Sequence, residues 1–233
     1  MQWARNAVKR KTGFLHVAYS SFLCPELLAI LSDLHFEGAD DPVLRMTSMH
    51  TGGIIQDMLE GRYEAGIGYL PIYYPELEPR EVLDEDLMLC ISAQHRLFRH
   101  DSITPQDLDR ETLIGVSKYA LPEVHKEIHA YFEVLGIELN VIAEPFTFYE
   151  AIHMAAADRG IAMVSSGWSH LTQDGIVFRP LADKLLTMKS GIFVRRDNRT
   201  GFVNDSQELL WSRTETLRKE RQKMTLHPRH GPV

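Results

Sequence analysis

Short apolar runs alternate with amphipathic segments along most of the chain. The run Phe14 to Tyr19 has the length of a buried strand, and leucines then recur at helical spacing between residues 27 and 34. The same order follows with an apolar run at 43–47, a helical stripe at 54–59 and a third run at 65–70. Strands separated by helices of this length predict parallel pairing with right-handed crossovers, as in an α/β fold.

A second set of similar elements follows an alternating strand at residues 86–92. A Thr-x-x-Asp cap at Thr104 begins a short helix, and the pattern then predicts a helix at 123–135 and a strand at 161–164. Gly191 to Arg195 is expected to bring the chain back to the first unit. Two small doubly wound units that the chain crosses twice form a hinged clamp.

This pattern gives the expected organisation of the chain. We place the first crossing at Cys90 to Ala93. Residues 1–11 are interpreted as the end of a helix, and the tail at 223–233 is expected to be disordered. The first lobe is assigned to residues 12–91 with 191–222, and the second lobe to residues 92–190.

Charge and composition narrow the possible functions. The 233 residues are 44% hydrophobic. The chain has 25 Lys and Arg residues and 32 Asp and Glu residues, which gives a formal net charge of -7. This balance disfavours direct DNA binding by this chain alone. No stretch has the apolar length of a signal peptide or membrane span, so we expect no membrane partner and a cytoplasmic protein. Cys24 and Cys90 lie in apolar surroundings and suit buried reduced thiols, with a redox switch as the alternative.

Motifs for enzymes are incomplete in this chain. The Gly66-Ile67-Gly68 segment lacks the third glycine of a dinucleotide fingerprint, and residues 165–169 contain no G-x-S-x-G. His125 and His129 could share a helix face, but they do not form H-E-x-x-H. We therefore expect no catalytic residue, no cofactor and no metal.

The candidate chemistry is anion binding at the expected helix N-termini. Ser20 and Ser21, Thr51, and the segment Ser117 to Tyr119 place hydroxyl and backbone N–H groups where a helix dipole favours negative charge. The same serines and threonine could serve only as helix caps, and Lys118 could be a solvated loop charge. Both interpretations stay open from the residues alone.

Five segments, in order, resemble the effector-binding domains of LysR-type transcriptional regulators. They are Thr12 to Tyr19, Leu59 to Gly68, Ala93 to Leu97, Ile103 to Leu108 and Ala156 to Val164. The second is especially similar to the benzoate- and muconate-responsive branch. The resemblance covers about residues 12–212. Two positions depart from it, because Asp158 stands where the family usually has glycine and Ser165 where it usually has proline.

The resemblance implies a fold, a site and a mechanism. The fold would be two Rossmann-like lobes of the type 2 periplasmic-binding-protein plan, joined by a two-strand hinge. Thr51 matches an effector-contacting threonine, Ile67 and Tyr69 match pocket-lining positions, and Pro145-Phe146 would face them from the second lobe. Tyr69 and Phe146 could equally be packing residues, and Phe22 suits the core. The candidate effector-binding residues are Ser20, Ser21, Phe22, Thr51, Ile67, Tyr69, Ser117, Lys118, Tyr119, Pro145 and Phe146.

The implied function is sensing of a small effector, expected to be a carboxylate, with no bond made or broken. DNA would be contacted only through a helix-turn-helix that this sequence lacks. A homodimer is implied, with Leu27 to Phe36 against Met154 to Ile161 of a second copy, and a tetramer in the full-length regulator. A free-standing solute receptor and a small-molecule enzyme on the same two-lobe plan are the alternatives.

Overall fold

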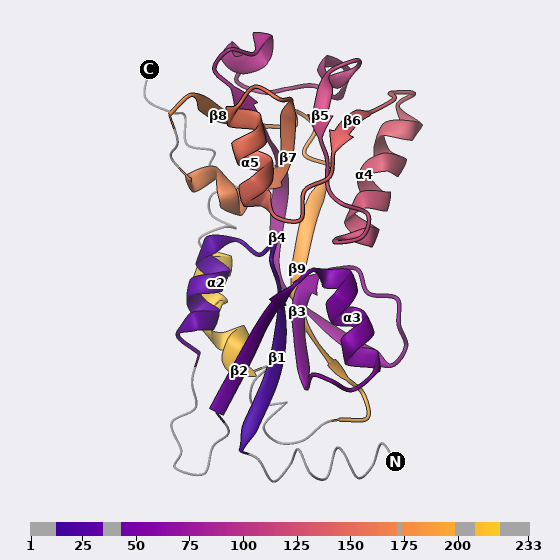
Figure 1. Ribbon diagram of the computed structural model, residues 1–233, viewed down its shortest axis with the longest axis vertical. Helices are drawn as coiled ribbons and strands as arrows, with labels where there is room; N and C mark the ends of the chain where they lie inside the picture. Colours follow the sequence, from indigo (N-terminus) through magenta and orange to yellow (C-terminus); the bar gives the residue numbers. More distant parts are fainter. Residues whose placement is uncertain (1–12, 35–42, 172–173, 199–207, 220–233) are drawn as a thin grey trace.

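The computed structural model describes residues 13–34, 43–171, 174–198 and 208–219 (Figure 1). The expected helix end at 1–11 and the expected tail at 223–233 lie outside these residues. The strands are β1 (Phe14–Ser20), β2 (Val43–Met49), β3 (Ala65–Tyr69), β4 (Leu77–Ser92), β5 (Thr112–Ile114), β6 (Asn140–Ala143), β7 (Ile161–Ser165), β8 (Ile176–Pro180) and β9 (Thr187–Arg195). The helices with bounds are α2 (Pro25–Ser32), α3 (Thr51–Leu59), α4 (Pro122–Val134) and α5 (Phe148–Ala156), with short 3-10 helices η1 (Arg96–Arg99), η2 (Pro105–Leu108) and η3 (Ser166–His170).

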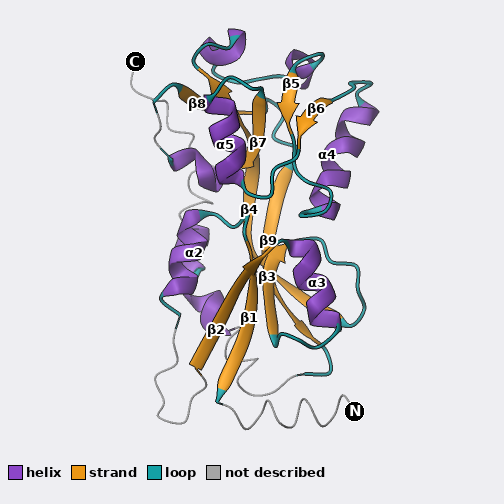
Figure 2. Cartoon of the chain, viewed as in Figure 1, coloured by secondary structure: helices purple, strands orange, loops and turns teal. Residues whose placement is uncertain are grey.

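The first lobe is built on the strand order β2-β1-β3-β9-β4. The strand β1 pairs in parallel with both β2 and β3, while β9 runs antiparallel to β3 and β4. Successive connections run from β1 to one neighbour and then across to the other, so right-handed crossovers place α2 and α3 on opposite faces. Figure 2 shows both helices flanking the strands, as the sequence pattern predicts.

The second lobe continues the same path through β7, β5 and β6, with β8 also pairing with β4. The strand β5 is parallel to β6 and β7, whereas β4 is antiparallel to β7 and β8. The helices α4 and α5 flank this smaller sheet (Figure 1). Among the residues that the structure describes, the strands β4 and β9 connect the two halves of the sheet path, which gives two lobes on one hinge and confirms the expected fold class.

The long strand β4 belongs to both lobes. Its residues Leu77 to Asp86 pair with β9, and Leu87 to Ser92 pair with β7 and β8. The change of partner therefore falls before the expected crossing at Cys90 to Ala93. The pattern of the sequence indicated only the second half of this strand, because Pro79 and several charged residues interrupt the first half.

Strands in the middle of each sheet are buried on both faces. All five residues of β3 and all five of β7 are buried. A Cβ added at Gly66 would lie 2.4 Å from Cε2 of Phe193 and 2.7 Å from Cγ2 of Ile54, so the helix and sheet approach closely here. Helices on both faces explain why these strands are continuous apolar runs rather than alternating ones.

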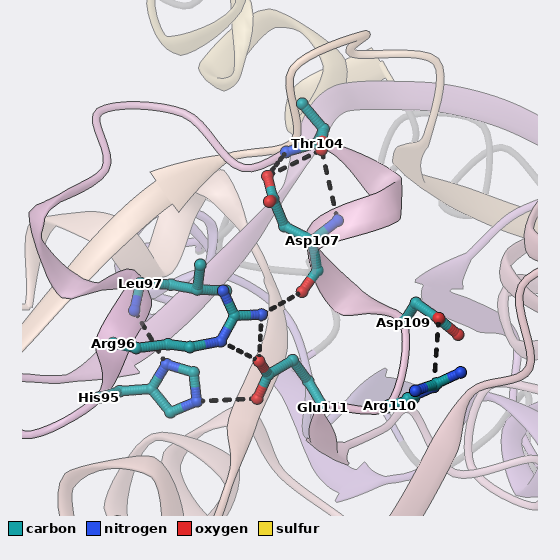
Figure 3. Close-up of polar contacts among 8 residues, drawn as sticks. All are labelled: His95, Arg96, Leu97, Thr104, Asp107, Asp109, Arg110 and Glu111. Carbon is teal, nitrogen blue, oxygen red and sulfur yellow. Dashed lines mark hydrogen bonds and ion pairs between the residues drawn. The ribbon is translucent and has the colours of Figure 1, made fainter.

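Polar contacts fix the start of the second lobe (Figure 3). The predicted cap is confirmed: Asp107 N donates to Thr104 Oγ1 at 3.3 Å, and Thr104 N donates to Asp107 Oδ2 at 2.9 Å. Nearby, Arg96 Nε donates to Glu111 Oε1 at 2.6 Å and His95 Nε2 lies 3.1 Å from Glu111 Oε2. This cluster holds η1 and η2 at the end of the lobe that faces away from the first lobe (Figure 1).

Candidate functional site

The lobes meet where the parallel strands of the first lobe end. Ser20 is fully buried at the end of β1, and its Oγ accepts a hydrogen bond from Phe22 N at 3.3 Å. Ser21 N donates to Met49 O at 2.9 Å, and Ser21 Oγ donates to Phe146 O of the second lobe at 3.1 Å. Ser21 therefore joins the lobes directly, while Ser20 holds the turn that follows β1. Neither caps α2, whose N-cap residue is Cys24.

The N-terminus of α3 has a different cap from the one that the sequence predicted. The N-cap residue is His50, whose Nδ1 accepts from Gly53 N at 2.9 Å. Thr51 is the first helical residue, and its buried Oγ1 accepts from Tyr69 N at 3.2 Å. The prediction of Thr51 as the N-cap is wrong because His50 performs that role. The Thr51 hydroxyl instead joins α3 to the end of β3.

Aromatic residues pack across the hinge between the two lobes. The ring of Phe22 is buried and lies 4.9 Å, edge to face, from the ring of Phe148 on α5. The carbonyl oxygen of Phe22 accepts from Tyr69 Oη at 3.0 Å and from Trp168 Nε1 at 3.3 Å. Phe22 is thus a core residue shared by both lobes. Ile67 is likewise buried, inside the sheet of the first lobe.

The phenol group of Tyr69 is a weaker acid than usual. Its side chain is buried, and burial, together with the negative charges of Glu85 and Cys24, raises its pKa well above the ordinary value of 10. Its hydroxyl is therefore a neutral donor, consistent with the hydrogen bond to Phe22.

The loop before α4 carries the second-lobe candidates. Ser117 is buried, and its Oγ accepts from Tyr119 N at 3.3 Å. Lys118 N donates to Glu144 Oε2 at 3.3 Å, and Lys118 Nζ lies 5.2 Å from the centroid of the exposed Tyr119 ring. The backbone donors that the sequence suggested for an anion therefore have acceptors within the protein.

Pro145 and Phe146 follow β6 and face the start of α3. The ring of Phe146 is half exposed and lies 6.0 Å from the ring of His50. Phe146 N donates to Glu150 Oε2 at 3.0 Å. This segment and the loop before α4 form the second-lobe wall of the cleft.

The two walls are close together. Gly52 N donates to Ala120 O at 3.2 Å, and a Cβ added at Gly52 would lie 2.7 Å from Tyr119 O. Beside this contact is a small crevice that is open to solvent and has room for about one water molecule. It is lined by Thr51, Ile55, Tyr69, Leu70 and Pro71 of the first lobe and by Leu121, Pro122, Glu123 and Val124 of the second. Pockets for small ligands are typically about 300–1,000 Å³, so this crevice is too small to hold a metabolite unless the contact between the lobes opens.

The structure brings together only part of the predicted set. Thr51 and Tyr69 line the crevice, Ser21 and Phe146 touch across the lobes, and Tyr119 O abuts Gly52. Ser20, Phe22, Ile67 and Ser117 are buried as supporting residues, whereas Lys118 is exposed and Pro145 is half-buried.

Sequence reasoning missed His50 and Glu144, which occupy backbone donors at the cleft. A usable signal for Glu144 was its place directly after β6, because ligand sites in α/β sheets lie beyond the carboxyl ends of parallel strands. No such signal distinguished His50 from Thr51. Among the residues that the structure describes, no group of three or more His, Cys, Asp and Glu is placed to hold a metal. In the same described part of the chain, every helix is too short or too polar to cross a bilayer.

A family model and the curated relatives of this chain point to the same family. The model of the LysR substrate binding domain matches residues 9–206. The HTH-type transcriptional regulator AlsR of Bacillus subtilis (strain 168) is 25% identical over 148 residues, 64% of this chain and 49% of AlsR. The HTH-type transcriptional regulator BenM of Acinetobacter baylyi is 23% identical over 171 residues, 72% of this chain and 56% of BenM. The chain thus spans about half the length of these relatives, which are regulators rather than enzymes.

Solved structures share the fold. A variant of the BenM effector binding domain superposes with a TM-score of 0.70 at 20% identity, covering 90% of this chain and 96% of that one. The effector binding domain of QuiR in complex with shikimate gives a TM-score of 0.71 at 15% identity, covering 88% and 97%. The BenM effector binding domain with its effector benzoate gives 0.66 at 19% identity, covering 94% and 95%. Together with the match over residues 9–206, these likenesses show that the chain belongs to the LysR substrate binding domain family, the effector-binding part of LysR-type transcriptional regulators.

Proposed function

We propose that this domain senses a small carboxylate in the cleft between its lobes and thereby controls DNA binding by a helix-turn-helix outside this sequence. The observation that carries the proposal is a crevice lined from both lobes, with Thr51 and Tyr69 among its first-lobe residues. A ligand that contacts both walls favours one lobe angle over others, because it stabilises only the arrangement that it bridges. A cytoplasmic location follows from this role.

The relatives support the carboxylate class. Benzoate is the effector bound in the BenM structure, and shikimate is bound in the QuiR structure, and both molecules carry a carboxylate. In this chain the start of α3 offers the Thr51 hydroxyl and the Gly52 amide. A helix N-terminus favours negative charge, so a ligand carboxylate is suited to this position. The Gly52 amide now donates to Ala120 O, so we expect effector entry to break this contact.

Calorimetry with benzoate, shikimate and related carboxylates tests the proposal. Thr51→Val removes the hydroxyl while keeping the shape, and we expect at least about tenfold weaker binding, the effect of one lost hydrogen bond to a charged group. Thr51→Ser keeps the hydroxyl and is expected to bind like the wild type. Thermal unfolding of both variants controls for the lost Tyr69 N contact. Equal affinity of the valine variant would refute the role of Thr51.

We also propose that the domain forms a homodimer, with a tetramer in the full-length regulator. Leu27 and Leu31 of the expected surface are buried in their own lobe. Leu28, Ile30 and Leu34 are half-buried and are left for a second copy. Residues 35 and 36 of that surface lie outside the described residues. Their expected counterpart includes Met154 on α5, which is also half-buried. Ile30→Glu should shift the sedimentation coefficient toward a monomer, and a wild type that is already monomeric would contradict the proposal.

A further inference from the structure

The loop before α4 has a carboxylate of the protein bound to it. Lys118 N donates to Glu144 Oε2 at 3.3 Å, although Glu144 lies 26 residues further along the chain. Lys118 and the flanking Tyr119 belong to the loop whose backbone abuts Gly52 at the start of α3. A side-chain carboxylate therefore already occupies a backbone donor of the second-lobe wall.

The Glu144 carboxylate also has a histidine neighbour. Its Oε1 lies 3.5 Å from Nε2 of His125, and the His125 ring lies 4.1 Å from the ring of His129. Burial, followed by the neighbouring His129, lowers the pKa of His125, so His125 is neutral near pH 7. Glu144 remains about one-third exposed, which leaves it free to move toward solvent.

Glu144 is also close in sequence to the contact between the lobes. Two residues later, Phe146 O accepts from Ser21 Oγ of the first lobe at 3.1 Å. Between them, Pro145 restricts the backbone, so a movement of Glu144 is transmitted to a short and stiff segment. Displacement of the Glu144 carboxylate can therefore weaken the bridge between Ser21 and Phe146.

We propose that Glu144 is a specificity-determining residue that competes, as a tethered anion, with ligand carboxylates for the Lys118 amide. The inference rests on the proposed function, since it names what a carboxylate must displace on the second-lobe wall. A tethered group has a high effective concentration, so only a ligand with further contacts in the cleft displaces it. Small anions without such contacts bind the Lys118 amide more weakly than they would without Glu144, and binding of the correct ligand releases Glu144.

The test follows the Lys118 amide signal by nitrogen-proton NMR during titration with acetate at constant ionic strength. In Glu144→Gln the neutral amide is a weaker competitor, and we expect half-saturation at about tenfold lower acetate than in the wild type. Glu144→Asp, whose carboxylate is retracted from Lys118 N, should lie between them. Acetamide, the neutral analogue of acetate, should show no difference among the three proteins.

The matched control is Glu150→Gln, because Glu150 also binds a backbone donor, Phe146 N, through one carboxylate oxygen at 3.0 Å. It should respond to acetate like the wild type. The proposal is overturned if the Lys118 amide of Glu144→Gln ignores acetate, or if its half-saturation equals that of the wild type. Failure of the proposed function looks different, because calorimetry would then find no carboxylate effector even while Glu144→Gln takes up acetate at Lys118.

Discussion

Asp158 ends helix α5 in a backbone conformation that favours glycine. Its φ is 56°, Asp158 N donates to Ala155 O, and Arg159 N donates to Met154 O at 3.0 Å. These bonds form the helix ending in which a left-handed residue follows the C-cap. The position is also one at which the sequence departs from the family pattern, and the structure gives that departure a cost in backbone strain.

We predict that Asp158→Gly raises the free energy of unfolding by about 0.5–1 kcal/mol, because relief of the left-handed strain exceeds the added freedom of the unfolded chain. Chemical denaturation measures this change. Asp158→Ala is the control, since alanine tolerates a positive φ less well, and it should be less stable than the wild type. A glycine variant no more stable than the alanine variant would contradict the explanation.

Cys90 predicts a dependence of stability on alkaline pH. The thiol is fully buried, and burial raises its pKa from 9.0 to about 12. Above pH 9 the unfolded chain loses this proton while the folded chain keeps it, so the free energy of unfolding falls as pH rises. The free energy of unfolding falls by no more than about 1.4 kcal/mol per pH unit, and below pH 8 it does not depend on this thiol.

Urea denaturation of the wild type and Cys90→Ala between pH 7 and 10.5 isolates this effect. The stability difference between the two proteins should be constant up to about pH 8 and should shift against the wild type above pH 9. A difference that is constant over the whole range would contradict the assigned pKa.

For single residues, the sequence predicted where a polar residue would lie better than it predicted the hydrogen-bond partner of that residue. The cap at Thr104 was predicted correctly because its partner, Asp107, is three residues away. The partners of Ser21, Thr51 and Lys118 come from distant segments, so a local pattern could not reveal them. For the same reason it could not show that the backbone donors of the cleft have acceptors within the protein.

Among the elements, the buried strands were the most predictable. The strands β1, β3 and β7 are more continuously apolar than a strand with one exposed face, because helices cover both faces of such strands. The first half of β4 was missed because Pro79 and several charged residues interrupt its apolar pattern, and its pairing with β9 shows that it is a strand. Pairing of this kind is tertiary information.

Two arginine side chains that stack on Trp211 stabilise the helix at residues 208–219. Arg80 Cζ lies 4.0 Å and Arg218 Cζ 3.5 Å from the centroid of a Trp211 ring, and Arg80 Nη1 is 2.5 Å from Glu208 Oε1. Each cation-π contact contributes about 0.5–2 kcal/mol. Trp211 therefore holds the helix to Arg80 of β4, and Leu210 is buried in the hydrophobic core.

We predict that Trp211→Leu loosens this helix without unfolding the first lobe. Hydrogen exchange of the amides at residues 214 and 218 should become at least about tenfold faster, since one lost contact of this size changes local opening by that factor. Arg213→Ala, at an exposed position of the same helix, should leave exchange unchanged. Unchanged exchange in Trp211→Leu, or equal acceleration throughout the first lobe, would contradict the prediction.

For the whole molecule, the structure is a clamp in which two lobes touch through Ser21 and Phe146 and through Gly52 and Ala120. The aromatic packing of Phe22 against Phe148 lies behind these contacts and joins the lobes near the hinge strands. The crevice between the lobes is too small for a metabolite, so binding requires the lobes to separate or the contacts to be replaced. The two-lobe plan was predictable from the order of elements, whereas these direct contacts between the lobes were not.

The most direct test of the account is to map where a carboxylate effector binds by nitrogen-proton NMR. During titration with benzoate, shikimate or a related carboxylate, the amides of Gly52 and Lys118 should shift together with one dissociation constant, although they belong to different lobes. Binding whose shifts are confined to one lobe, or lie away from these two amides, would contradict the account.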